Sequence, residues 1–142
     1  MTMNHKGQIH YLNPKGLHPN PAFTQMVTVS GPVRAVYIAA QTAVDEAGNI
    51  VGKGDLAAQT LQILRNIEVC LEAAGARPEH LIHWSIYVAE GHDMRPAFEV
   101  GVRWWGNRPN PPMNNVMYVS GFWPAEFLIS IEAIAVVPLE EQ

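Results

Sequence analysis

Two stretches of the chain carry apolar residues at the three-to-four spacing of an amphipathic helix. The first stretch begins after Asp55, a residue type that caps helix N-termini, and stops at Gly75, a residue type that ends helices. Its apolar stripe consists of Leu56, Thr60, Ile63, Ile67, Leu71 and Ala74. A second helix is predicted over about 94–106, with Pro96 tolerated in its first turn. Its inner face is predicted from Phe98, Val102 and Trp105.

Segment 81–89 instead alternates between the two sides of a strand, which is typical of a half-buried β-strand. One side carries Ile82, Trp84, Ile86 and Val88, and the other carries His83, Ser85 and Tyr87. Segments rich in β-branched and aromatic residues predict five further strands. These lie at about 8–12, 24–30, 33–40, 115–122 and 127–137. We expect the strands at 24–30 and 33–40, which only Gly31-Pro32 separates, to pair with each other.

This order of elements predicts an α+β fold: a single, mostly antiparallel sheet with two helices on one face. The length of 142 residues fits one domain, 1–142, with a substantial core. A single sheet with helices on one face leaves its other face in need of cover. The low charged fraction of 15% favours cover by other subunits, because such interfaces resemble a protein core cut in half.

The charge pattern disfavours a nucleic-acid partner, since the net charge is −4 and no cluster of Lys and Arg could neutralise phosphates. Cys70 is the single cysteine, which excludes an internal disulfide and fits a reducing cytosol. The N-terminal residues lack the apolar core of a signal peptide, and no apolar run reaches the ~18 residues of a membrane helix. We therefore expect a cytoplasmic protein without a membrane partner.

The histidines do not predict a metal site. His80 and His83 are three residues apart but straddle a predicted helix-to-strand junction, and no nearby Cys or paired carboxylate completes a zinc set. A phosphate-binding glycine loop and a recognisable Ser-His-Asp arrangement are also missing from the sequence. We expect neither a metal nor another cofactor.

Three motifs resemble the RidA/YjgF family of small trimeric proteins: 54–60 (GDLAAQT), 71–75 (LEAAG) and 131–136 (IEAIAV). The resemblance covers about residues 20–137. It implies a chorismate mutase-like fold and a homotrimer in which three sheets pack around a central barrel. It also implies substrate clefts between neighbouring subunits, and hydrolysis of reactive enamines and imines.

Two segments resemble the family's substrate-binding segments. Residues 21–25 (PAFTQ) resemble its glycine-proline-tyrosine-serine-glutamine segment, with Phe23 at the aromatic position. Residues 36–41 (VYIAAQ) resemble a strand that usually ends in serine-glycine-glutamine; Gln41 is kept, but Ala40 stands where glycine lets a ligand approach the backbone closely. For Phe23, simple packing at a subunit contact is the alternative.

The chain departs from the family at the arginine that clamps the substrate carboxylate. Here the approach to the penultimate strand reads PPMNNV over 111–116, so Met113 takes the arginine's place, or Asn114 after a one-residue slip. A thioether cannot replace the bidentate, charge-assisted bonds of an arginine. This departure disfavours 2-imino acids as substrates. Arg108, in the preceding Pro-rich loop, can restore a cation by swinging in, although loop arginines are usually solvated.

Two more pocket positions differ. Asn115 stands where the family often has cysteine or threonine, and Ser130 replaces a glutamate proposed to position the attacking water. Glu132 is retained and faces the same side of its strand as Ser130. The weak catalytic candidates are thus Asn115, Ser130, Glu132 and Arg108. The substrate-binding candidates are Phe23, Ala40, Gln41, Met113, Asn114, Asn115, Tyr118 and Ser130, with Trp123 as a further candidate.

Such a neutral, partly apolar cleft suits an uncharged or aromatic ligand. Two hypotheses follow: hydrolysis of an uncharged or aromatic imine or enamine with release of ammonia, or a noncatalytic trimer that binds small molecules or regulates a partner. Ordinary interface packing, with satisfied amides, is the alternative to any pocket at these positions.

Overall fold

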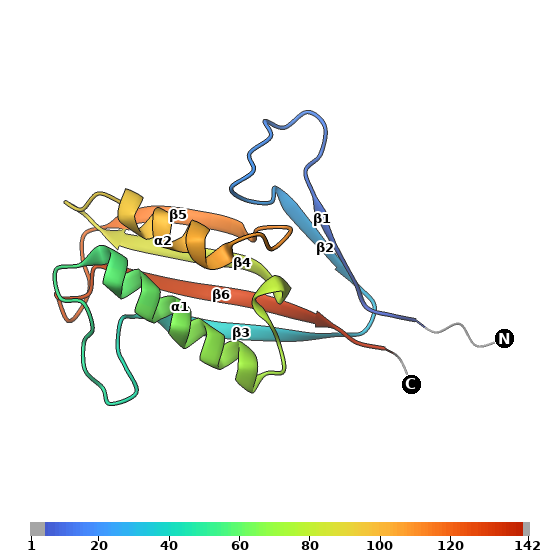
Figure 1. The fold of residues 1–142 in the computed structure, drawn as a ribbon. Helices are drawn as coiled ribbons and strands as arrows, with labels where there is room; N and C mark the ends of the chain where they lie inside the picture. Colours follow the sequence, from blue (N-terminus) through green and yellow to red (C-terminus); the bar gives the residue numbers. More distant parts are fainter. Residues whose placement is uncertain (1–4, 141–142) are drawn as a thin grey trace.

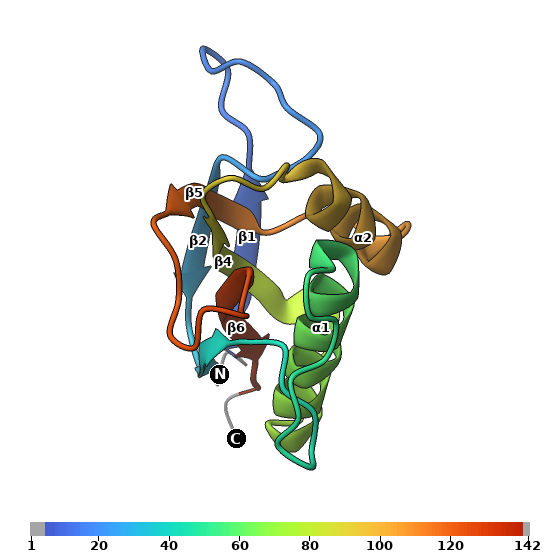
Figure 2. The same ribbon diagram turned by 90° about the vertical axis from the view of Figure 1, so that its left-hand side faces the viewer.

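Four of the strands form one mixed sheet, and both helices lie on the same face of it (Figures 1 and 2). The computed structural model describes residues 5–140; residues 1–4, which bear on the expected lack of a signal peptide, lie outside the described residues. The strand order is β3 (Val33–Gln41), β6 (Ile129–Pro138), β4 (Leu81–Ala89) and β5 (Met113–Val119). The helices are α1 (Leu56–Ala73) and α2 (Arg95–Trp105), and a 3-10 turn, η1 (Pro78–His80), precedes β4.

The sheet is antiparallel except for its last pair. β3 pairs with β6 and β6 pairs with β4 in antiparallel register, whereas β4 and β5 run parallel. The parallel pair follows from the connection, because α2 carries the chain back across the sheet between β4 and β5. The expected α+β class with two helices on one face is confirmed in this form.

The expectation of a single sheet was wrong, as was the pairing of 24–30 with 33–40. Strand β2 (Met26–Ser30) pairs with β1 (Gln8–Leu12) in a separate two-stranded sheet, and the inner edge of β3 is taken by β6. Gly31, with a φ of 77°, forms the corner that separates β2 from β3. Just after this corner, Pro32 O accepts a hydrogen bond at 3.0 Å from the N–H of Leu139, the residue that follows β6.

Side chains fasten this hairpin to the main sheet. The Tyr11 hydroxyl donates to the carbonyls of Glu79 and Leu81 at 3.4 and 3.2 Å, just where β4 begins. The Thr24 hydroxyl donates to Pro111 O at 2.6 Å, just before β5. The hairpin therefore lies against the starts of β4 and β5, and β5 carries four of the candidate site residues.

Helix α1 forms as its sequence predicts. The Asp55 carboxylate accepts a hydrogen bond from Ala58 N–H at 3.0 Å, and Gly75 adopts a φ of 67° after the helix ends. The predicted stripe faces the sheet: all of its members are buried except Ala74, which is half-buried at the C-terminal cap. α1 thus supplies one side of the hydrophobic core, and β6 and β4 supply the other.

Helix α2 has the predicted position, but its inner face differs. Pro96 lies in the first turn as expected. Ala97, Val100 and Trp105 are the buried residues, whereas Phe98 is 57% and Val102 54% exposed. The prediction was wrong for Phe98 and Val102 because α2 packs beside α1, which turns these two side chains toward an open groove.

The alternation predicted for 81–89 is confirmed from His83 onward and defines two faces of the sheet; before His83 a register shift brings Leu81, and not Ile82, into the core. Trp84 and Ile86 point to the helices, while His83 and Ser85 line a concavity on the opposite side. We call that opposite side the open face. Large side chains there are exposed: Tyr37 at 78% and Met117 at 49%. Among residues 5–140, no helix is long and apolar enough to cross a membrane.

Candidate functional site

The strand register gathers four of the candidate residues on the open face. On β4, Ser85 lies between Asn115 of β5 and Glu132 of β6. Two residues before Ser85, His83 is the partner of Met113; two residues after it, Tyr87 is the partner of Ser130. Because paired residues point to the same side of a sheet, Met113, Asn115, Ser130 and Glu132 share the open face.

Glu132 is the carboxylate at the centre of this arrangement. It is exposed, and its Oε1 accepts a hydrogen bond from the Tyr87 hydroxyl at 3.4 Å. The surrounding concavity has a volume of about 500 Å³, and its wall includes Tyr37, Ala39, His83, Ser85, Glu132 and Ile134. A carboxylate held by a phenol and open to solvent can accept a proton from a bound water.

The contribution of β4 to this site was not predicted from the sequence. His83, Ser85 and Tyr87 all lie on the open face, as their alternation had indicated. What the sequence did not supply was the register that brings them beside Glu132. Ser85 and Ser130 are both buried there, so their hydroxyls are part of the floor of the site and not of its rim.

Two other candidates lie on the opposite face. Asn114 is paired with Trp84 on the helix side of β5, and Tyr118, four residues further along the strand, points the same way. Between Met113 and Asn114, the two alternatives for the family arginine's place, it is Met113 that shares a face with Glu132. The predicted single cleft is therefore divided by the sheet.

Arg108 lies at the C-terminal end of α2, where several groups hold its guanidinium. Its Nε is 3.1 Å from Glu79 Oε1, and its Nη1 donates to the carbonyls of Trp104 and Trp105 at 2.6 and 3.1 Å. Burial acts to raise the pKa of Glu79, but hydrogen bonds from its own backbone and Arg108, with nearby guanidinium charge, outweigh burial and lower that pKa. To serve as the missing cation, Arg108 would have to leave all of these partners.

The remaining candidates lie in loops or at the C-terminal end of β3. Phe23 is half-buried in the loop that Thr24 ties to Pro111. Ala40 is exposed where the register of β3 shifts, and the Gln41 amide donates to Ala39 O at 3.1 Å. Trp123 is 93% exposed in the loop before β6.

Metal ligands do not converge in the described part of the chain: no three His, Cys, Asp or Glu side chains among residues 5–140 form a group that could hold an ion.

The sequence and the fold both resemble known proteins. The family described as Endoribonuclease L-PSP matches residues 15–137. A RutC family protein of Pyrococcus horikoshii is 35% identical over 100 residues, which are 70% of this chain and 77% of that protein. A RutC family protein of Pyrococcus abyssi is 34% identical over 101 residues, which are 70% of this chain and 76% of that protein.

Solved structures agree with this assignment. A protein of unknown function from Yersinia pestis, of the conserved Rid protein family, superposes with a TM-score of 0.78 and 31% identity, over 89% of this chain and 97% of that one. The YjgF gene product of E. coli gives a TM-score of 0.63 and 25% identity, over 75% and 81% of the two chains. The motifs, the sheet with its two helices and these similarities together show that the chain belongs to the RidA/YjgF family.

Proposed function

We propose that the chain hydrolyses an uncharged or aromatic imine or enamine on its open face and releases ammonia. The observation that carries this proposal is the exposed Glu132 carboxylate, which is bonded to Tyr87 and flanked by neutral polar groups. We place the reaction in a reducing cytosol, in keeping with the single Cys70.

The proposed reaction needs one base and a set of hydrogen bonds. Glu132 takes a proton from water as the water oxygen attacks the C=N carbon, and passes that proton to the imine nitrogen, which becomes the amine of an amino alcohol. The carbinol hydroxyl then gives its proton to Glu132, which passes it to the amine; the C–N bond breaks as the C=O bond forms, and the nitrogen leaves as ammonia. Tyr87 orients the carboxylate, and Ser85 and Asn115 are placed to bond the substrate.

The substrate class follows from the side chain at position 113. A substrate carboxylate would meet Met113 and, among described residues, no arginine or lysine lines the open-face concavity. A buried carboxylate without a cation is costly, whereas a neutral or aromatic group suits a thioether. An anionic 2-imino acid is therefore disfavoured.

We also propose that the reactive cleft is completed in a homotrimer. The open face exposes Tyr37 and Met117, and the family resemblance implies that such faces meet around a central axis. Small-molecule binding between subunits would then enclose Glu132 and exclude bulk water, which strengthens its electrostatic interactions.

Ammonia release from a panel of neutral, aromatic and carboxylate-bearing imines tests the proposal. We expect the neutral and aromatic imines to be turned over fastest, and Glu132→Gln to lower kcat by about 100-fold because a general base contributes 10²–10⁴-fold. Tyr87→Phe should lower kcat less, because Tyr87 orients the base Glu132 and is not the base itself.

Glu72→Gln is the matched control, because Glu72 is an exposed carboxylate on α1 and should leave the rate unchanged. Binding without ammonia release across the whole panel would refute hydrolysis and favour the noncatalytic binding protein. Turnover that survives Glu132→Gln would show that the base lies elsewhere.

A further inference from the structure

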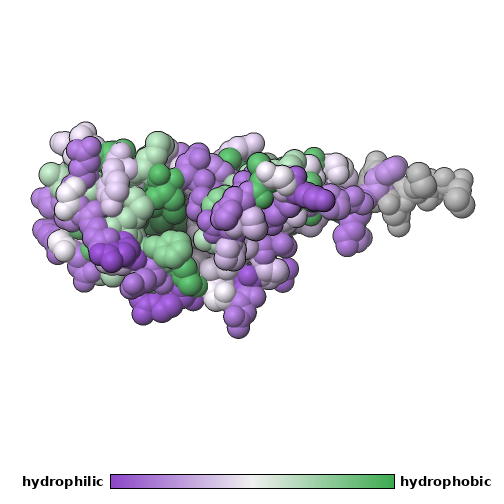
Figure 3. Space-filling view, turned by 90° about the horizontal axis from the view of Figure 1, so that it is seen from above, coloured by the Kyte–Doolittle hydropathy of each residue, from purple (hydrophilic) through white to green (hydrophobic). Residues whose placement is uncertain are grey.

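A groove on the helix side of the sheet, away from Glu132, is not used by the proposed reaction. It runs between α2 and the strands β4 and β5, and its volume is about 430 Å³. Figure 3 shows hydrophobic side chains gathered around a hollow in this part of the surface. A volume in this range is typical of sites that bind small molecules.

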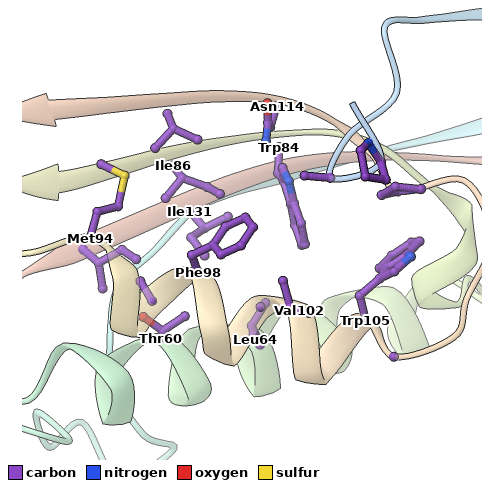
Figure 4. A pocket seen from close by; sticks show the side chains of 18 residues that line it. Thr60, Leu64, Trp84, Ile86, Met94, Phe98, Val102, Trp105, Asn114 and Ile131 are labelled. Carbon is purple, nitrogen blue, oxygen red and sulfur yellow. The ribbon is translucent and has the colours of Figure 1, made fainter. Parts of the chain in front are cut away.

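Aromatic rings form the walls of this groove (Figure 4). Trp84 on β4 and Trp105 on α2 meet edge to face, with ring centroids 6.3 Å apart. The Trp105 indole N–H is fixed by Arg108 O at 2.8 Å. Phe98, on the opposite part of α2, leaves more than half of its surface exposed to the groove and solvent. Flat apolar walls of this kind favour a flat apolar ligand.

Gly101 is the position on α2 from which the groove can be filled by substitution. It lies inside α2 and lines the groove, and a Cβ added there would meet no atom within 4 Å. Its φ is not in the left-handed region that requires glycine. Glycine inside a helix costs about 0.5–1 kcal/mol relative to alanine. Neither backbone geometry nor local crowding requires glycine here, so a larger side chain placed at position 101 would extend into the groove.

The polar groups that line the groove are uncharged, which disfavours a charged ligand. Within the described part of the chain, no Asp, Glu, Lys or Arg lines it. The Thr60 hydroxyl already donates to Leu56 O at 2.8 Å. The Asn114 amide, in contrast, makes no hydrogen bond to any other described residue. It offers both donors and an acceptor to a ligand.

We infer that this groove is a second small-molecule site, which binds a flat, uncharged aromatic compound of one or two fused rings with a hydroxyl or amide directed at Asn114. The site is separate from the proposed reactive cleft. Neighbouring asparagines of β5 serve the two faces: Asn114 the groove, and Asn115 the side of Glu132.

Calorimetric titration of the whole protein with 2-naphthol tests this inference. Ligand efficiencies of small molecules place the expected Kd between about 10 µM and 1 mM. 2-Naphthoate, which has the same rings and a negative charge, should bind at least about tenfold more weakly, because the groove offers no cation to replace its hydration. Equal affinity for the two probes would refute an uncharged ligand.

Two substitutions at Gly101 form a matched pair. Gly101→Leu should fill the groove and weaken 2-naphthol binding at least about tenfold, whereas Gly101→Ala should leave the Kd within about twofold. Both residues are better helix formers than glycine, so both variants should melt no lower than wild type. Wild-type affinity in Gly101→Leu would overturn the site.

Asn114→Ala examines the polar contact. It should weaken 2-naphthol about three- to tenfold and leave the binding of naphthalene unchanged, since only the hydroxylated probe uses the amide. Glu132→Gln, on the other face of the sheet, should change neither the Kd of 2-naphthol nor that of naphthalene. A loss of 2-naphthol binding in Glu132→Gln would place the probe on the open face and refute a second site.

Discussion

A single residue step along β5 separates two environments. Met113 and Asn115 lie on the open face, where Glu132 is exposed, and Asn114 between them lines an apolar groove. The sequence left two alternatives for the position of the family arginine, Met113 and Asn114. The alternation of side chains along a strand favours Met113, because only that position shares a face with Ser130 and Glu132.

We expect wild-type turnover of 2-iminopropanoate to be at least 10- to 100-fold below that of an arginine-bearing relative, since a charge-assisted contact contributes about 1.5–3 kcal/mol. Met113→Arg alone should help little, because Ser130 stands where the family resemblance implies a second glutamate that positions the water. Met113→Arg with Ser130→Glu should raise ammonia release at least about tenfold above either single variant.

Asn114→Arg with Ser130→Glu is the control for this pair, since it places the cation on the helix side and should give no gain. If wild type already matched the arginine-bearing relative, the claim would be refuted, and Arg108 would be the first residue to mutate.

The helices and β4 could be predicted at the scale of the element because their signals are local. The Asp55 cap and the α1 stripe need only neighbours in sequence, and the alternation of 81–89 needs only the strand itself. The pairing of β2 with β1 joins strands that the loop 13–25 separates, and the pairing of β3 with β6 joins opposite ends of the chain, so neither can be read from a local pattern.

The same limit applied to the candidate site. The residue types were recognised, but their grouping required the parallel register of β5 on β4 and the antiparallel register of β6. For α2, apolar Phe98 and Val102 fit a buried core face and an exposed groove equally well by periodicity. Only the packing of α2 beside α1 distinguishes these two roles.

Gln59 joins α1 to the segment that leads into β6. Its buried amide donates to the carbonyls of Gly52 and Glu126 at 3.1 and 2.9 Å, and accepts from Leu128 N–H at 2.8 Å. Gln59→Leu should lower the free energy of unfolding by about 2–4 kcal/mol in urea denaturation, because buried backbone groups lose their partners at about 1–3 kcal/mol each.

Gln62→Leu is the control on the same helix and should cost much less, since among residues 5–140 the Gln62 amide bonds only to the Asn66 side chain. Equal losses in the two variants would mean that the bonds of Gln59 contribute nothing beyond helix packing.

At the scale of the whole molecule, we expect a homotrimer built on the open faces. Sedimentation at micromolar concentration should give about three times the 15.7 kDa chain mass. Tyr37→Glu, which places a charge on the open face, should shift the protein toward monomer because burying an unpaired charge is costly.

Val69→Glu is the comparison, because Val69 is 67% exposed on α1 and away from that face, so its trimer should persist. A wild-type monomer with an intact fold would contradict the trimer and, with it, the enclosed reactive cleft.

The packing of three indoles gives the protein an optical signature. Trp84, Trp104 and Trp105 have ring centroids 6.2–6.3 Å apart, while Trp123 is solvated. At such separations the transition dipoles of neighbouring indoles couple, so the cluster should give an exciton band in far-ultraviolet circular dichroism, whereas Trp123 reports on solvent. Acrylamide should quench the Trp123 emission first, and the part of the exciton band that comes from Trp84 should vanish when β4 and α2 separate.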